Sequence, residues 1–284
     1  MQTKSAKEDQ PAYHALVGNL RTGNRSTKTL LTGREGSPDN YKLSYGGDKS
    51  PEDWTTPRHR HTFEQIRWAV SGDYMIKKDE MLPAGWVAYF PESVYYGPQV
   101  KYANSCQMTL QFGGPSGIGY WSMRQRGEAF QTLSAKGKFE DGFYVWTDAD
   151  GRKRKRDAAE AVQDEAFGHT IEYPEPRYKD IVSMNPAAFG WDQDSELTGV
   201  SRKRLGSFTE RDVRVQFINM DKGANLPLGL EKSAELLFLK SGLLAHDNST
   251  YDDLTALGTE ADEAPVTLTA IEPSELMYIK LPTF

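Results

Sequence analysis

The chain has 284 residues, of which 38% are hydrophobic, enough for one large or two ordinary domains with cores of their own. Its formal net charge of −6 and isoelectric point of about 5.5 argue against nucleic acid as the main partner, because phosphate binding needs a basic surface. The one cysteine permits no internal disulfide, the first residues lack the apolar core of a signal peptide, and no apolar stretch approaches the ~20 residues that cross a bilayer. We therefore expect a cytoplasmic protein with no membrane role.

The first part of the chain is typical of short β-strands. Runs rich in β-branched and aromatic residues alternate with Gly, Pro, Asp and Asn, as in KTLLTG, YKLSY, IRWAVSG, WVAYFP and CQMTLQFGG. Several short strands at close spacing predict an antiparallel sandwich or barrel rather than βαβ units.

Two histidines lie two residues apart in the run HRHTFEQIRWAVSG. Alternate side chains of an extended strand share a face, so His59 and His61 point the same way and are suited to binding one ion. Gln65 follows four residues later and is a candidate third ligand. Imidazole and amide oxygen suit borderline divalent metals, so we expect one divalent transition metal, Zn, Ni, Fe, Mn or Cu.

Two further residues of this half, Arg67 and Tyr96, are candidates for contact with a substrate. Arg67, two residues beyond Gln65, shares its face, and a buried charge needs a partner. A substrate carboxylate or phenolate would serve, and so would a structural salt bridge, for instance with Glu64; the sequence leaves both open. For Tyr96, a wall or hydrogen-bond donor is favoured over a metal ligand or a general acid/base.

A strand over CQMTLQF has one apolar and one polar face. The polar face carries Gln107, Thr109 and Gln111. If this face looks into a barrel, it lines a hydrogen-bonding pocket; if it looks outward, it is merely solvated, which is the default expectation.

Between about Gly113 and Gly199 the composition changes. The segment GGPSGIGYW lacks the Lys and Ser/Thr of a phosphate loop and is predicted to be a connector. The basic run GRKRKR at 151–156 is predicted to be a solvated turn before a helix rather than an anion or nuclear-localisation patch. Helix-forming composition, an acidic first turn and Gly168 at the stop predict one helix over about 157–167. Strand-like runs resume with VRVQFINM and ELLFLKSG.

The two halves share a spacing pattern. Six residues separate Gln65 from Gly72 and Glu235 from Gly242, and a proline stands five positions before Tyr96 and before Tyr278. The halves therefore look like repeats of one barrel. We expect an all-β protein with one barrel at 1–125, a mixed connector with the helix at 126–198, and a second barrel at 199–284.

The chain resembles a bicupin, two cupin jelly-roll-type β-barrels in tandem. The first cupin motif has His-x-His, then Glu or Gln, then Gly after six residues, as His59, His61, Gln65 and Gly72 do. The second has Gly, five residues, Pro, and a His five positions on. Gly85 and Pro91 fit it, but Tyr96 stands where the histidine belongs. The resemblance is good over about 55–112 and loose over about 213–281.

In the second half, Leu228 and Leu230 take the positions of the two histidines. Leucine cannot coordinate a metal, so we expect the C-terminal barrel to be metal-free and to serve as scaffold, dimer surface or lid.

The HxHxxxQ form resembles cupins that isomerise, cyclise or open oxygenated rings, whereas dioxygenase and decarboxylase cupins more often carry Glu. The resemblance implies a metal-dependent enzyme that converts a small oxygenated molecule by Lewis-acid isomerisation, cyclisation or lyase chemistry. In that mechanism Arg67 orients an acidic group, Tyr96 or Glu64 moves a proton, and Gln107 and Gln111 contact the substrate. Iron- or copper-dependent dioxygenation of an enol or aromatic diol is the rival, and a non-catalytic small-molecule binder is a third hypothesis. Open sheet edges favour a homodimer.

Overall fold

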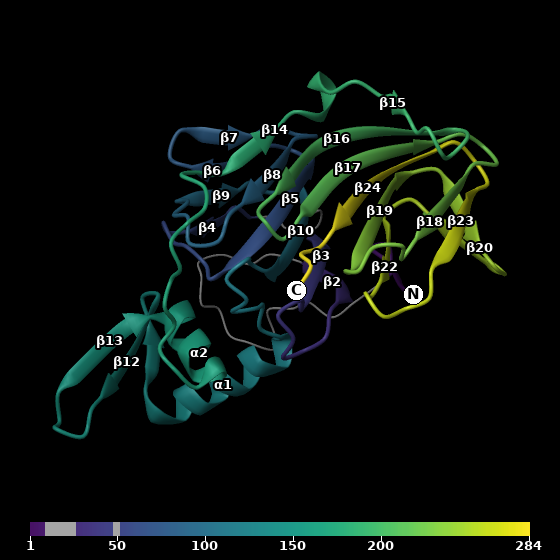
Figure 1. Cartoon of the computed structure of the whole chain (residues 1–284). Coiled ribbons are helices and arrows are strands. Elements are labelled where there is room, and N and C mark those ends of the chain that lie inside the picture. Colours follow the sequence, from purple (N-terminus) through teal and green to yellow (C-terminus); the bar gives the residue numbers. More distant parts are fainter. Residues whose placement is uncertain (9–26, 48–51) are drawn as a thin grey trace.

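The computed structural model describes residues 1–8, 27–47 and 52–284 (Figure 1). Within these ranges the regular structure is mostly antiparallel strand, with two α-helices between the two halves of the chain. This confirms the predicted all-β class. Neither helix of the described residues has the length and apolar character needed to cross a membrane.

The first half forms a barrel with two walls. Its larger sheet has the order β14 (Val182–Met184), β8 (Val87–Phe90), β5 (Phe63–Ser71), β10 (Cys106–Gly113), β3 (Tyr41–Gly46), β2 (Thr27–Thr32). The smaller sheet has the order β4 (Trp54–Thr56), β9 (Gln99–Lys101), β6 (Tyr74–Lys77), β7 (Glu80–Leu82). An apolar cluster that includes Tyr74, Leu82 and Phe90 fills part of this barrel, and a cavity with a different set of lining residues opens from another part.

The second half repeats this plan. Its larger sheet has the order β1 (Gln2–Ser5), β22 (Thr255–Thr259), β19 (Glu235–Ser241), β24 (Ser274–Lys280), β17 (Val213–Met220), β16 (Val200–Phe208), β15 (Asp192–Gln193). The smaller sheet has the order β18 (Asn225–Leu228), β23 (Val266–Ala270), β20 (Leu243–His246), β21 (Ser249–Asp252). Leucines such as Leu226, Leu237 and Leu268 fill this barrel from wall to wall.

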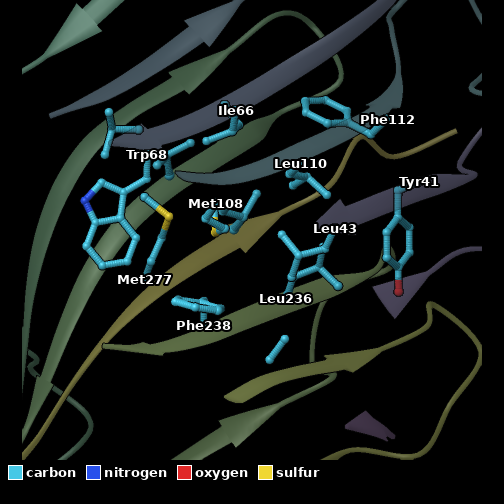
Figure 2. Close-up of a cluster of buried hydrophobic side chains, with 14 of the residues drawn as sticks. Tyr41, Leu43, Ile66, Trp68, Met108, Leu110, Phe112, Leu236, Phe238 and Met277 are labelled. Carbon is cyan, nitrogen blue, oxygen red and sulfur yellow. The ribbon is translucent and has the colours of Figure 1, made fainter. Parts of the chain in front are cut away.

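The two larger sheets pack against each other and share one apolar core (Figure 2). Trp68 on β5 meets Phe217 of β17 and Phe238 of β19, with ring centroids 5.5 and 6.0 Å apart. The apolar alternation of β10 supplies Met108 and Leu110 to the same layer. Each barrel therefore covers the apolar outer face of the other.

Two strands cross between the halves. β1, at the start of the chain, pairs with β22 of the second barrel. β14, which follows the helices, pairs with β8 of the first. The spatial units therefore depart from the expected sequence boundaries at these two strands, because β1 covers an open sheet edge of the second barrel and β14, from the connector, covers one of the first.

The connector folds as an insertion that projects from the first barrel (Figure 1). It contains α1 (Met123–Lys136), the sheet β11 (Lys138–Glu140), β12 (Phe143–Thr147) and β13 (Lys153–Asp157), and α2 (Ala158–Phe167), followed by a 3-10 turn at Pro186–Ala188. The predicted helix is confirmed: the Asp157 side chain caps its first amides, and Gly168 ends it with a φ of 72°. It has Glu160 in its first turn and buries Ala161 and Val162.

The expectation of one helix is wrong, because α1 precedes it. A capping box of Ser122 and Gln125 starts α1, but the helix buries only Ala129 and Leu133, too sparse an apolar stripe to stand out in the sequence. The basic run is also more than a turn. It turns at Gly151 and then continues as strand β13 against β12.

Candidate functional site in the first barrel

A cavity of about 290 Å³ opens between the first barrel and the insertion. Its barrel walls come from β2, β3, β4, β5, β9 and β10 and from the loop that carries the two histidines, and the insertion contributes residues of α1, β13 and α2. Such a volume suits a small molecule. The fold thus leaves a polar chamber in one barrel, whereas leucines fill the other.

The polar face of β10 looks into this chamber. Gln107, Thr109 and Gln111 line the cavity, and Gln111 accepts a hydrogen bond from the Tyr120 hydroxyl at 3.1 Å. The default expectation of a solvated face is wrong, because the second barrel covers the apolar face and so turns the polar one inward. Gln107 is only 3% exposed.

The two histidines stand side by side on the cavity wall. Their ring centroids are 5.0 Å apart, and the His59 ring lies 4.4 Å from that of Tyr96. His59 Nδ1 lies 2.7 Å from the Pro57 carbonyl oxygen, which only accepts hydrogen bonds, so Nδ1 carries the hydrogen and Nε2 the lone pair. The His61 ring stacks on Phe63 at 4.3 Å. The backbones of His59 and Tyr96 are joined by two hydrogen bonds of 2.9 Å.

Gln65 and Arg67 bind each other. Arg67 donates from Nε and Nη2 to the Gln65 carbonyl oxygen, at 3.1 and 2.7 Å. Gln65 Nε2 donates to the Tyr96 hydroxyl oxygen at 2.6 Å, and Arg67 Nη2 reaches the same oxygen at 3.3 Å. Arg67 Nη1 donates to Gln99 Oε1 at 3.1 Å. This network places a buried guanidinium among neutral oxygens.

These contacts change the expected roles of both residues. The salt bridge considered for Arg67 is not formed with any acid in the described ranges, and Glu64 lies on the opposite face of the strand. Four of the five Arg67 N–H groups donate to Gln65, Tyr96 and Gln99. Only one N–H group is left to bind a substrate acid directly. Arg67 contributes positive charge to the cavity.

Glu64 does not reach the cavity. Its side chain enters the layer between the barrels and accepts a hydrogen bond from the Tyr89 hydroxyl. Burial raises the pKa of Glu64 to about 8, and the carboxyl of Glu92 adds to this rise. The expected proton transfer by Glu64 at the site is therefore wrong, because strand alternation points it away from Gln65.

The donor set fits a divalent metal through its two imidazoles. Rings that share one metal at the usual metal–nitrogen distance have centroids about 5 Å apart, as His59 and His61 do. Gln65 does not fit as a third ligand in this arrangement, because the Arg67 guanidinium occupies its carbonyl oxygen. No cluster of three His, Cys, Asp or Glu side chains suited to a metal occurs among the described residues.

Positive charge predominates around the cavity. Among the described residues, two acids and six cations line it, the cations being Lys42, Arg58, Arg60, Arg67, Lys101 and Arg126. Burial lowers the pKa of Lys42 to about 7, and the nearby charge of Arg126 adds to this effect. The arrangement favours an anionic ligand. The sequence did not predict most of these cations as site residues, because they come from separate elements of the chain.

The second barrel offers no comparable chamber in the described residues. Leu228 is fully buried in the leucine core, whereas Leu230 is 66% exposed, so the two positions equivalent to the histidines do not even face the same way. Glu235 accepts hydrogen bonds from the Tyr278 hydroxyl at 3.0 Å and the Glu231 amide at 2.8 Å.

Comparison with solved structures finds similar folds over nearly the whole chain. A "putative dioxygenase" from Nostoc punctiforme is 10% identical with a TM-score of 0.58, and the match covers 99% of this chain and 87% of that one. A "putative glyoxylate induced protein" from Pseudomonas aeruginosa is 11% identical with a TM-score of 0.53, covering 95% and 87%. A variant of oxalate decarboxylase from Bacillus subtilis is 11% identical with a TM-score of 0.54, covering 99% and 77%.

No protein-family model matches the sequence, and no curated protein matches it. At such identities the likeness to the solved structures concerns the fold.

Proposed function

We propose that the cavity of the first barrel is the active site of a metal-dependent enzyme of the bicupin type, whose tandem-barrel fold this chain shares. Its substrate is a small, oxygenated organic anion. The reaction is non-redox: isomerisation, cyclisation or a lyase step. Oxalate decarboxylase and a "putative dioxygenase" among the similar folds support enzyme chemistry in such a barrel.

The observation that carries this proposal is the pair of imidazoles beside a buried guanidinium. His59 and His61 face one cavity, and the hydrogen on His59 Nδ1 leaves Nε2 as the nitrogen that binds a metal. Arg67 lies on the neighbouring strand segment with no acid partner in the described ranges. A site of this kind holds a cation with neutral ligands and attracts an anion.

Each residue has a separate task in the proposed mechanism. His59 and His61 would hold the metal, which supplies Lewis acidity toward a substrate oxygen. Arg67 stabilises negative charge that develops on the substrate, and Gln65 and Gln99 keep its guanidinium in place. Two N–H donors meet at the Tyr96 oxygen, so we assign Tyr96 to positioning Gln65 and Arg67 rather than to ligation.

Metal analysis tests the proposal directly. Protein purified without chelator is expected to carry about one divalent ion per chain, and the His59→Ala/His61→Ala variant is expected to carry none. His246→Ala, in the second barrel, is the matched control and should keep the metal. Equal metal content in the wild type and the double variant would remove the proposed function.

Oxygen uptake during turnover decides the reaction type. We expect none, since the proposed step moves no electrons to oxygen. Stoichiometric oxygen consumption would instead establish the dioxygenase alternative. The non-catalytic alternative is favoured by Gln65, whose carbonyl oxygen is already engaged, and it would be supported if metal-free and metal-loaded protein bound the same ligand without converting it.

A further inference from the structure

Two amide side chains of the inner cavity wall have unused hydrogen-bonding atoms. Gln107 is 3% exposed, and neither its Oε1 nor its Nε2 has a partner. Gln99 is 1% exposed, and its Nε2 has none, although its Oε1 accepts from Arg67. Leaving such atoms buried and unpaired costs free energy, because they have lost their hydrogen bonds to water. Polar atoms that are buried, unpaired and turned toward a cavity indicate a ligand that pairs with them.

The strands around Gln107 leave room for that ligand. Its cross-strand neighbours are Gly46 on β3 and Ala69 on β5, the smallest residues of the two walls. The positions next along β10 differ, because Thr109 lies opposite Ser44 and Arg67. A hydroxyl group is therefore able to pair with both amide atoms of Gln107, donating to Oε1 and accepting from Nε2, whereas a carbonyl group pairs with Nε2 alone.

The exposed rim of the same cavity carries two arginines without acid partners in the described ranges. Arg58 and Arg60 both lie over the ring of Tyr95, with guanidinium carbons 4.0 and 4.7 Å from its centroid. Arg60 also lies 3.7 Å over the ring of Tyr173, and its Nε is buried without a partner. Two like charges on one ring repel each other, so an anion between them would lower the energy of both.

The rim arginines are better placed than Arg67 to bind an acidic group. The N–H groups of Arg67 are committed to Gln65, Tyr96 and Gln99, whereas no hydrogen bond from the guanidinium of Arg58 or Arg60 to an acid is present in the described part of the chain. Carboxylates bind guanidinium groups through paired hydrogen bonds, which need uncommitted donors.

We propose, building on the function proposed above, that the substrate is a hydroxylated organic acid held at two ends. Arg58 and Arg60 bind its acidic group at the rim. Gln107 and Gln99 bind a hydroxyl or carbonyl group at the inner wall. The reacting part of the molecule then lies between these ends, along the wall that carries His59 and His61.

Three probes with six-membered rings test the two binding regions separately. Galacturonate carries an acid and hydroxyls, galactose carries only hydroxyls, and cyclohexanecarboxylate carries only the acid. Titration calorimetry is done on the full chain, with and without prior chelation. The Arg58→Met/Arg60→Met variant is expected to bind galacturonate and cyclohexanecarboxylate about tenfold more weakly and galactose as before. Gln107→Met is expected to weaken galacturonate and galactose about tenfold and to spare cyclohexanecarboxylate.

Controls separate these effects from charge and folding. Arg152→Met/Arg204→Met removes the same net charge from exposed positions elsewhere and should leave all binding unchanged. Gln107→Met should melt no earlier than the wild type, because it removes unpaired buried atoms.

The proposal is overturned if the wild type does not bind galacturonate at millimolar concentration, or if either rim or wall variant binds it as tightly as the wild type. The pattern requires neither metal nor turnover. A wild type that carries no metal as purified but shows this pattern would therefore remove the proposed function and leave the two-ended site standing. A wild type that carries the metal but lacks the pattern would overturn the two-ended site and leave the proposed function standing.

Discussion

Glu64 is a carboxyl group buried between two barrels. It is 1% exposed, and its Oε2 has no hydrogen-bond partner. Burial is the main cause of its raised pKa; the Tyr89 hydroxyl opposes the rise, Glu92 adds to it, and the more distant Arg177 and Glu210 act in opposite directions. The charged form is therefore disfavoured in the folded chain, whereas water stabilises it in the unfolded chain.

Glu64 should make stability depend on pH. Between the ordinary value of 4.5 and about 8, the folded state keeps a proton that the unfolded state releases, so stability falls as pH rises through this window. The loss is at most about 1.4 kcal/mol per pH unit. Glu64→Gln removes this titration. In urea unfolding between about pH 5 and pH 8, the free energy of unfolding of the variant should therefore rise relative to that of the wild type as pH rises. Glu272→Gln changes an exposed carboxylate and is the control: its free energy of unfolding should depend on pH as that of the wild type does. The same pH dependence for Glu64→Gln and the wild type would contradict the prediction.

At the scale of elements, α2 connects the insertion to the barrel. Its N-terminal amides are bound by Asp157 at 2.9 and 3.1 Å, and its Gln163 donates to the Thr62 hydroxyl at 2.6 Å. The helix ends at Gly168, whose backbone is left-handed. These local contacts keep Glu160 and Gln163 on the cavity lining.

The helix end supplies a test of backbone strain alone. A Cβ at Gly168 would meet nothing within 4 Å, but its φ of 72° is unfavourable for any residue with a side chain. Gly168→Ala should lower the free energy of unfolding by about 1–2 kcal/mol, and Gly168→Asn by less, because Asn tolerates this conformation. Gly190→Ala, also in open space but without a positive φ, is the control. Equal stability of the two alanine variants in urea unfolding would rule the explanation out.

At the scale of the whole molecule, the two barrels depend on one core. Trp68 meets Phe217 and Phe238 between the sheets. β1 pairs with a strand of the second barrel, and β14 of the connector pairs with a strand of the first. Separating the barrels would expose the apolar layer on both sides. The second barrel therefore acts as a scaffold that turns the polar strand faces of the first inward.

Unfolding should accordingly be a single cooperative transition. Calorimetric and van't Hoff enthalpies are expected to agree for the whole chain. Trp68→Ala should lower the free energy of unfolding by about 3–5 kcal/mol and keep one transition, because it opens a cavity in the shared core. Trp191→Ala, at a side chain 39% exposed, should cost much less. Two separate heat-absorption peaks in the wild type would show that the barrels unfold independently.

The sequence by itself determined what depends on neighbouring residues. Strand alternation, the caps of α2, the two-residue spacing of His59 and His61 and the repeated Gly and Pro positions are local patterns, and they predicted the two-barrel architecture and the histidine pair. The weak apolar stripe of α1 is local too, but it was too sparse to recognise.

Only the tertiary structure decided which strand faces line the cavity and which contacts occupy the candidate ligands. Alternation shows that β10 has two faces, but the packing of the second barrel determines that Gln107 faces inward and Glu64 does not. The hydrogen bond from Gln65 to the Tyr96 hydroxyl, and the cations that β3, β9 and α1 bring to one cavity, join residues far apart in the chain. Such contacts arise from burial and charge in three dimensions, which no spacing along the sequence encodes.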